Sequence, residues 1–265
     1  MIETMELPDP SIVSPFLRSD VLRNCGMLAS IERNIPPFPR TVWAARRKDH
    51  TIGAMLVTDG PGQGTVDLRA TDPQAIEPLL RCLDPDRPYS FSVPAHLLDA
   101  FLPHVRQPAY KSQTVILSAR PDDLRSFRLD LDYHRLTLAD RPAVQVFPES
   151  ASYEPPLAMY LDWALARPEG LAMYGLFEAG CLIGHVGWAV QIDNVWEATF
   201  IRIRSDRRGK GLGRALLARS TRDLLAAGHI PLYELDSSNH ASLRIAIVAG
   251  YHEITRIHHY DALRP

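Results

Sequence analysis

The segment Arg208-Gly209-Lys210-Gly211-Leu212-Gly213 places three glycines and two cations within six residues. Glycine adopts positive φ angles at little cost and carries no side chain that would block a ligand. A leucine-rich segment with roughly helical spacing follows to about Ala227, so a helix is predicted to begin here. The first backbone N–H groups of a helix have no partner within it and favour an anion. The segment therefore predicts a site for a phosphate or pyrophosphate.

Basic residues are concentrated around this segment. Between positions 202 and 222 there are eight cations and one acid, Asp206, in a chain whose net charge is −2. Hydrogen bonds to charged groups are worth about 1.5–3 kcal/mol each, so the cluster favours a polyanionic ligand. The alternative is a solvated basic helix face, which would not require the glycines.

Two common phosphate loops do not fit the segment. A Walker A loop needs Gly-x4-Gly-Lys-Ser/Thr, and the sequence has no such run. A dinucleotide loop, Gly-x-Gly-x-x-Gly, would begin at Gly209 but has Arg214 at its sixth position. It would also stand early in a βαβ array rather than after several strands. The sequence thus excludes a P-loop hydrolase and disfavours a dinucleotide fold.

The predicted elements around the segment alternate between strands and helices. Three strands in close succession precede it, and the long helix is followed by a strand, a helix and a strand. The predicted strands are 134–138, 171–177, 181–190, 195–203, 232–235 and 251–256, with 257–260 as a candidate partner of the last, and the helices are 156–166, 212–227 and 239–249. Gly228 and Gly250 stand where helices commonly end.

Three motifs occur here in a consistent order. The first is Arg-x-x-Gly-x-Gly, at Arg208, Gly211 and Gly213. The second is the preceding strand, Glu197–Ile203, acidic and then apolar, and the third is Asn239-His240-Ala241-Ser242, with Ala249-Gly250-Tyr251 ending its helix. Together they resemble the GNAT superfamily of N-acetyltransferases over about residues 130–262. The resemblance implies an α/β (α+β) fold with a mixed, mostly antiparallel central sheet flanked by helices, and an acyltransferase with acetyl-CoA as donor cosubstrate.

The N-terminal half shows a fainter version of the same order. Its segment Asp49–Gly53 resembles Gly180–Gly184, and strands near 65–68 and 89–93 alternate with helices near 73–83 and 95–102. Ala70-Thr71-Asp72-Pro73 replaces the glycine loop. We therefore expect a degenerate acetyltransferase-like copy over 1–125 and an acetyltransferase domain over 126–265. The alternative is that two α+β halves share this order by coincidence.

The resemblance also implies which residues hold acetyl-CoA. Backbone N–H groups would cradle its pyrophosphate, the pantetheine would pair with a strand as an added strand, and two residues at the start of the following helix would lie against it. The predicted set is Ile201, Arg202, Ile203, Arg208, Gly209, Lys210, Gly211, Leu212, Gly213, Arg214, Asn239 and Ser242.

Transfer to an amine needs a base, because most amines are protonated near pH 7. The resemblance implies Glu197 as this base; a surface carboxylate paired with an arginine is the alternative. Many family members carry a proton-donating tyrosine where this chain has Ala246. Ser242 and Tyr251 are the candidate substitutes, and the thiolate can also leave unassisted. A strand N–H near Ile201 would meet the oxyanion.

Histidines and cysteines give no predicted metal site. His252, His258 and His259 lack acidic partners at ligand spacing and are predicted to be solvated. His185 either lines the acceptor side or packs in the core. The chain's three cysteines are too few and too scattered for a disulfide framework or a zinc site.

Charge and composition limit the partners. The net charge of −2 disfavours nucleic acid, no segment is apolar enough to span a membrane, and the first residues lack the apolar core of a secretion signal. We therefore expect a cytoplasmic monomer or homodimer whose partners are acetyl-CoA and a primary amine of a small molecule, amino acid or polypeptide. The competing interpretation, which Ala246 suggests, is a catalytically silent acyl-CoA-binding or regulatory module.

Overall fold

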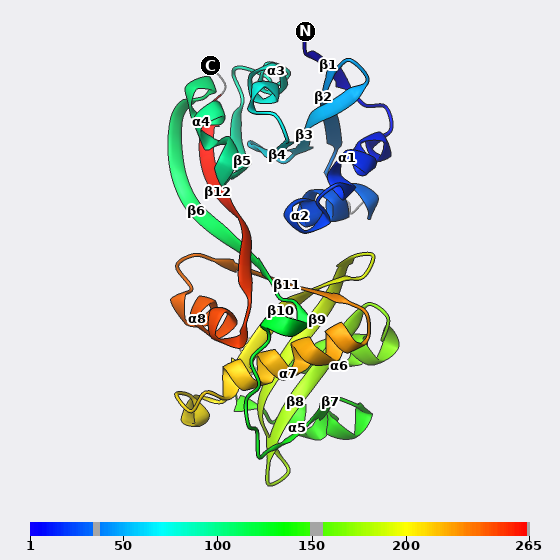
Figure 1. The fold of residues 1–265 in the computed structure, drawn as a ribbon, viewed down its shortest axis with the longest axis vertical. Helices are drawn as coiled ribbons and strands as arrows, with labels where there is room; N and C mark the ends of the chain where they lie inside the picture. Colours follow the sequence, from blue (N-terminus) through cyan, green and yellow to red (C-terminus); the bar gives the residue numbers. More distant parts are fainter. Residues whose placement is uncertain (34–37, 149–155, 264–265) are drawn as a thin grey trace. The chain divides into compact units, whose positions relative to one another are not determined.

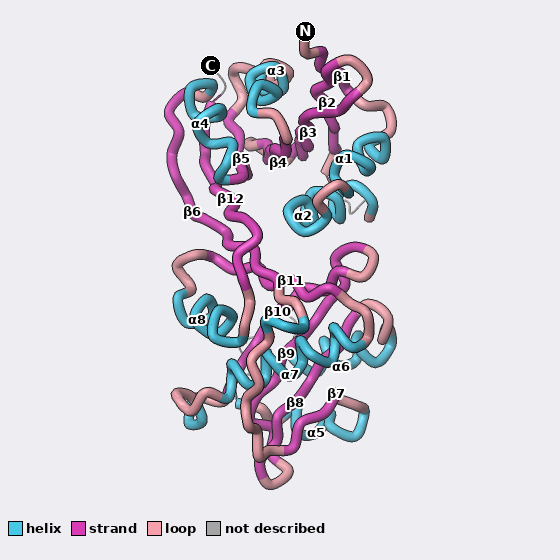
Figure 2. The backbone as a smooth tube through the Cα atoms, in the orientation of Figure 1, coloured by secondary structure: helices cyan, strands magenta, loops and turns pink. Residues whose placement is uncertain are grey.

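A computed structural model describes residues 1–33, 38–148 and 156–263. The chain divides into two compact units (Figure 1). Unit 1 contains Met1–Ile116, Asp236–Ser238 and Ile254–Pro265, and unit 2 contains Leu117–Leu235 and Asn239–Glu253. Each unit combines strands with helices (Figure 2), which confirms the predicted α/β class.

Unit 2 is built on a sheet with the strand order β11-β10-β9-β8-β7. Its elements are η5 Pro121–Asp123, β7 Asp132–Arg135, η6 Leu138–Asp140, α5 Arg141–Gln145, α6 Leu157–Ala166, β8 Leu171–Glu178, β9 Cys181–Ile192, β10 Val195–Ile203, η8 Ser205–Arg207, α7 Leu212–Ala226, β11 Ile230–Asp236 and α8 His240–Ala249. β10 and β11 are parallel, and the other neighbouring pairs are antiparallel. The sheet is therefore mixed and mostly antiparallel, as expected.

Helices cover both faces of this sheet. Apolar side chains of α5 and α6, including Val144 and Leu161, form one core with Met173 of β8. On the other face the Trp188 indole N–H of β9 donates to the Ser220 hydroxyl of α7 at 3.1 Å, and both side chains are buried. Strand alternation then assigns each residue of β10 to one of these two faces.

β10 and β11 separate after a short parallel contact. Their register pairs Val195–Glu197 with Ile230–Leu232, although β10 continues to Ile203 and β11 to Asp236. A β-bulge between Ala198 and Phe200 also interrupts the pairing of β10 with β9, and bulges bend and twist a strand. Glu197 is therefore the last paired residue before the strands diverge.

Unit 1 has the strand order β1-β2-β3-β4-β5-β12-β6. Its elements are β1 Glu3–Glu6, η1 Pro10–Val13, α1 Ser14–Arg18, α2 Val21–Glu32, β2 Arg40–Arg47, β3 His50–Asp59, β4 Gly64–Ala70, η2 Pro73–Ala75, α3 Ile76–Leu80, β5 Pro88–Pro94, η3 Ala95–Leu97, α4 Leu98–Phe101, η4 Leu102–His104, β6 Arg106–Ser118 and β12 His252–Leu263. Its core contains the tilted rings of Tyr89, Phe91 and Phe101. The helices predicted at 73–83 and 95–102 are shorter than expected, because each begins with a 3-10 turn.

The final strand differs from its prediction. Instead of a hairpin between 251–256 and 257–260, β12 runs without a turn from His252 to Leu263. Its residues Ile257–Leu263 pair antiparallel with Pro94–Pro88 of β5. Residues 252–260, where the hairpin was expected, contain no glycine, proline, asparagine, aspartate or serine, so nothing there favours a turn. From Ile254 onward this strand thus belongs to unit 1.

The two units repeat one order of elements. Strands β1 to β5 follow one another as β7 to β11 do, with two helices after the first strand and one after the fourth. β4 and β5 are also parallel only over Gly64–Asp67 and Tyr89–Ser92 before they diverge. The limits 1–125 and 126–265 stay a prediction for the two copies.

Candidate active site

The glycine-rich segment forms the start of α7. Gly209 and Gly211 have φ angles of 77° and 78°, and Gly211 is the N-cap of the helix. The first N–H to donate within the helix is that of Ala215, to the Gly211 carbonyl at 3.2 Å. In the described part of the chain no side chain caps this end. The preceding amides, including those of Leu212 and Gly213, are therefore available to a ligand.

Gly213 allows close packing against α8, and Gly211 supplies a backbone conformation that side chains rarely adopt. A Cβ on Gly213 would lie 3.2 Å from Cδ1 of Ile245, on α8. A Cβ on Gly211 would lie 2.9 Å from the Arg214 guanidinium, in a left-handed conformation that side chains rarely adopt. The absence of side chains thus keeps the helix end open.

The surrounding cations differ in how far carboxylates already neutralise them. Arg204 holds Asp206 through two hydrogen bonds, of 2.7 and 3.1 Å, and Arg207 lies 2.7 Å from the Glu178 carboxylate. Arg214 instead stacks over the ring of Phe127, 5.3 Å from its centroid. Among the described residues, no carboxylate pairs with Arg214.

A groove of about 1110 Å³ begins at this helix end. It runs between the free end of β10 and α8, where β10 has left β11. All twelve residues of the predicted donor-binding set line it: Ile201, Arg202, Ile203, Arg208, Gly209, Lys210, Gly211, Leu212, Gly213, Arg214, Asn239 and Ser242. The structure therefore brings the predicted set together in one place, and its ligand stays a prediction.

Five further groove residues were not predicted. Four of them, Ala241, Arg244, Ile245 and Val248, form one face of α8, and the fifth is Arg207. Their spacing of three and four residues is that of one helix face. This spacing is visible in the sequence, but only the fold shows that the face borders the groove.

Asn239 and Ser242 shape the wall of the groove at the start of α8. Asn239 is the N-cap, and its Oδ1 accepts the Ser242 N–H at 3.1 Å. The Ser242 side chain lies near the hydroxyl of Tyr233 on β11. Burial raises the pKa of Tyr233, and the neighbouring Ser242 opposes this rise. Ser242 thus joins the groove to a buried phenol that the sequence did not indicate.

Glu197 lies at the point where β10 and β11 diverge. It pairs with Ala189, next to Trp188, so alternation places it on the face away from α7. Burial raises its pKa to about 7, and the neighbouring carboxylate of Glu234 acts in the same direction. Glu197 does not line the groove itself; it stands on β10 ahead of Ile201, the first groove residue of that strand.

Tyr251 is not brought to the groove. The side chain is buried, and its hydroxyl lies 2.7 Å from Oγ1 of Thr221 on α7. Burial raises its pKa well above the usual value. Ala246, at the position of the usual proton donor, is also buried. Of the two candidate substitutes, the structure places only Ser242 at the groove.

The histidines occupy polar and core positions. His259 lies between the hydroxyls of Ser92 and Thr114, at 3.2 and 2.9 Å, so it is less solvated than predicted. His185 is fully buried between the rings of Phe147 and Phe200. Burial, with Arg202 nearby, lowers its pKa to about 3, so it is a neutral core residue. The described residues contain no cluster of three or more metal-ligating side chains.

The corresponding loop of unit 1 is built differently. Asp72 occupies the N-cap of η2, where its Oδ1 accepts the Gln74 N–H at 2.9 Å. Nη1 of Arg47 lies 2.7 Å from the same carboxylate. An acidic side chain thus fills the helix end that unit 2 leaves open, so this described loop offers no open cradle for an anion.

The geometry agrees with the family comparison. Residues 133–251 match the family described as Acetyltransferase (GNAT) family, so this part of the chain is a GNAT domain. Such domains generally transfer an acyl group from acyl-CoA. No curated protein matches the sequence, and in the described residues no helix has the length and hydropathy needed to cross a membrane.

Solved structures extend the likeness to the whole chain. A tandem GNAT protein from the clavulanic acid biosynthesis pathway shares 15% identity at a TM-score of 0.58, covering 99% of this chain and 98% of that one. A GNAT acetyltransferase from Colwellia psychrerythraea shares 12% identity at a TM-score of 0.64, covering 98% of this chain and 99% of that one. A GCN5-related N-acetyltransferase from Sphaerobacter thermophilus shares 12% identity at a TM-score of 0.61, covering 100% of this chain and 96% of that one. The N-terminal half therefore resembles a second GNAT-like domain, as predicted.

Proposed function

We propose that unit 2 transfers an acetyl group from acetyl-CoA to a primary amine by direct attack with general-base help. The observation that carries this proposal is the position of Glu197. It is the last residue of β10 that pairs with β11, and the groove of about 1110 Å³ reaches the same strand four residues further along, at Ile201. A donor that follows the groove along β10 would bring its thioester toward this carboxylate.

The donor is held by backbone groups more than by side chains. The amides from Arg208 to Arg214 bind the pyrophosphate, and the charge of Arg214 adds to the field of the helix end. The pantetheine then lies beside Ile201–Ile203, a stretch of β10 that has no pairing with β11. Its amides extend the sheet there in the manner of an added strand.

The chemistry requires a neutral amine. Glu197 removes the ammonium proton, directly or through a water molecule, and a carboxyl whose pKa is about 7 is suited to this task near neutral pH. The amine nitrogen attacks the thioester carbon, and a strand N–H near Ile201 stabilises the oxyanion. The nitrogen of the intermediate gives up its extra proton to solvent, and the intermediate collapses to the amide as the carbon–sulfur bond breaks.

The departing sulfur needs a proton, or it leaves as the thiolate. Ser242 is the candidate donor, because it lines the groove and lies near the Tyr233 hydroxyl. A thiol has a pKa of about 8.5, so unassisted departure is also feasible. The acceptor is a primary amine of a small molecule, amino acid or polypeptide, and a cytoplasmic location stays a prediction.

A measurement of thiol release tests the proposal. The chain is incubated with acetyl-CoA and a panel of primary amines, and free thiol is followed for the wild type and Glu197→Gln. We expect amine-dependent release that falls by about 10²–10³-fold in the variant, with unchanged CoA affinity. Equal rates would overturn the role of Glu197.

The competing function is a silent acyl-CoA-binding module. It is favoured by the buried Ala246 at the position of the usual proton donor and by the filled helix end of unit 1. Tight CoA binding by calorimetry, without thiol release for any amine, would support it. Binding of pyrophosphate as tight as that of CoA would instead indicate an anion site unrelated to CoA.

A further inference from the structure

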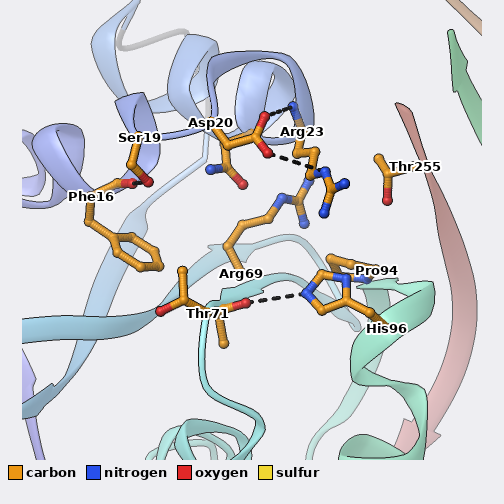
Figure 3. A pocket seen from close by; sticks show the side chains of 11 residues that line it. Phe16, Ser19, Asp20, Arg23, Arg69, Thr71, Pro94, His96 and Thr255 are labelled. Carbon is orange, nitrogen blue, oxygen red and sulfur yellow. Dashed lines mark hydrogen bonds and ion pairs between the residues drawn. The ribbon is translucent and has the colours of Figure 1, made fainter. Parts of the chain in front are cut away.

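Unit 1 contains a pocket that acetyl transfer in unit 2 does not use. Its volume is about 300 Å³ (Figure 3). It is lined by residues of α1 and α2 and the turn between them, by the end of β4 and by Thr255 of β12, all within unit 1. Pockets of this size are at the small end of ligand sites. The pocket therefore suits a small molecule rather than a nucleotide.

Arg69 gives this pocket a buried cation. Its side chain is 7% exposed and rises from the end of β4 into the pocket (Figure 3). Nη1 donates to the carbonyl of Leu68 at 2.7 Å, and the nearby carboxylate of Asp67 lies 3.9 Å away. A guanidinium is a planar donor that matches carboxylates well. A buried one that faces a cavity favours an anion there.

Arg23 brings a second cation from α2. The guanidinium groups of Arg69 and Arg23 extend toward the same part of the pocket (Figure 3). Asp20 lies 3.2 Å from Nε of Arg23. The lining contains these two arginines and one aspartate, and Asp67, the second carboxylate beside Arg69, stands outside the lining. An anion between the two guanidinium groups would reduce their mutual repulsion.

The rest of the lining suits an organic molecule. The ring of Phe16 and the ring of Pro94 provide apolar contact area. The hydroxyl of Thr71 lies on the same wall. A ligand with one charged oxygen group and a short carbon skeleton would therefore satisfy both the cations and the apolar surface.

The position of Arg69 is particular to unit 1. The pairing of β4 with β5 ends at Asp67, as that of β10 with β11 ends at Glu197. Arg69 stands two residues beyond Asp67, and the same position beyond Glu197 is the uncharged Thr199. Unit 1, which lacks the open helix end, thus carries a buried cation where its strands diverge.

We propose that this pocket binds a small organic carboxylate. The carboxylate lies between Arg69 and Arg23, and the carbon skeleton packs against Phe16 and Pro94. The proposal is independent of acetyl transfer, since none of the pocket residues belongs to the groove of unit 2.

Binding of a matched pair of probes to the full chain tests the proposal. 4-Fluorobenzoate and its neutral analogue 4-fluorobenzamide are followed by ¹⁹F NMR line broadening. We expect saturable broadening of the benzoate alone, reversed by succinate and other small carboxylates but not by the same concentration of inorganic phosphate. Saturating CoA should leave the signal unchanged, because it occupies the other unit.

Variants localise the binding. Arg69→Met and Arg23→Gln should each weaken the binding of 4-fluorobenzoate by about tenfold, whereas replacement of the exposed Arg81 by methionine should not. If Arg69→Met fails to fold, Arg23→Gln decides, because that side chain is nearly half exposed. The proposal would be overturned if the signal of 4-fluorobenzamide broadened equally or if no carboxylate bound saturably. Displacement of 4-fluorobenzoate by phosphate, or unchanged affinity in Arg23→Gln, would also overturn it.

Discussion

The hydroxyl of Tyr251 lies 2.7 Å from Oγ1 of Thr221, and both side chains are buried. Thr221 also donates to the Leu217 carbonyl at 2.7 Å, so the phenol is tied to the body of α7. Tyr251, which lies between the end of α8 and the start of β12, thus links this connection to α7.

Replacing this tyrosine should affect stability and leave catalysis unchanged. Tyr251→Phe removes one buried hydrogen bond, so we expect a loss of about 1 kcal/mol in the free energy of unfolding. Urea denaturation measures this loss, and thiol release should keep the wild-type rate. A large fall in rate with an unchanged KM would show that Tyr251 takes part in the reaction.

Gly211 should be essential for CoA binding. Gly211→Glu places a negative side chain at the open end of α7, so we expect CoA binding to be abolished while unfolding stays cooperative. Gly180→Ala is the matched control, because it has a φ of 77° and open space around it but lies outside the groove. Both variants should lose about 1 kcal/mol of stability. Calorimetric affinity for CoA in Gly211→Glu equal to that of the control would contradict the cradle.

Arg214 should contribute more to CoA binding than Arg204. The charge of Arg204 is already engaged by Asp206, whereas Arg214 contacts an aromatic ring beside the groove. We expect Arg214→Gln to weaken CoA binding by about tenfold and to reduce the dependence of this affinity on salt. Arg204→Gln, measured in parallel, should have a smaller effect, and the reverse order would place the phosphates elsewhere.

The pH dependence of the rate should report Glu197. Its raised pKa of about 7 means that the carboxylate form, which acts as base, becomes the major form only above that pH. We expect kcat/KM to rise through pH 7 in the wild type, and this rise to be missing in Glu197→Gln. A profile with the same midpoint in both proteins would assign the titration to another group.

The same pKa shift gives a prediction for stability. Because the folded pKa lies above the unfolded value, the folded state binds more protons between about pH 4.5 and 7. The contribution of Glu197 to stability is therefore greatest at low pH and is lost as pH rises through 7. Glu197→Gln should gain stability relative to the wild type between pH 5 and pH 8 in urea titrations. A constant difference between the two would show that burial does not raise this pKa.

Local sequence patterns predicted much of unit 2. Strand β10, helix α7 and helix α8 begin and end close to where alternation, leucine spacing and glycine placed them. The donor-binding residues could also be predicted from the sequence, because they lie in three short motifs. Patterns of this kind depend on neighbours in the chain, so one sequence is enough to see them.

The remaining features depend on contacts between distant residues. The separation of β10 and β11 after Glu197 is a property of register between two strands. The role of Tyr251 depends on Thr221, thirty residues earlier. The pocket of unit 1 joins α2, β4 and β12, and α2 carries no motif that would draw attention to Arg23. No local sequence pattern encodes such contacts between distant residues.

The strand β12 also has a consequence for synthesis. It is the last described element of the chain, yet it pairs with β5 inside unit 1. Until the ribosome has added residues 257–263, the edge of β5 has no such neighbour. The sheet of unit 1 is therefore completed only after unit 2 has been synthesised, and a nascent chain stalled before residue 252 would expose a sheet edge open to wrong partners.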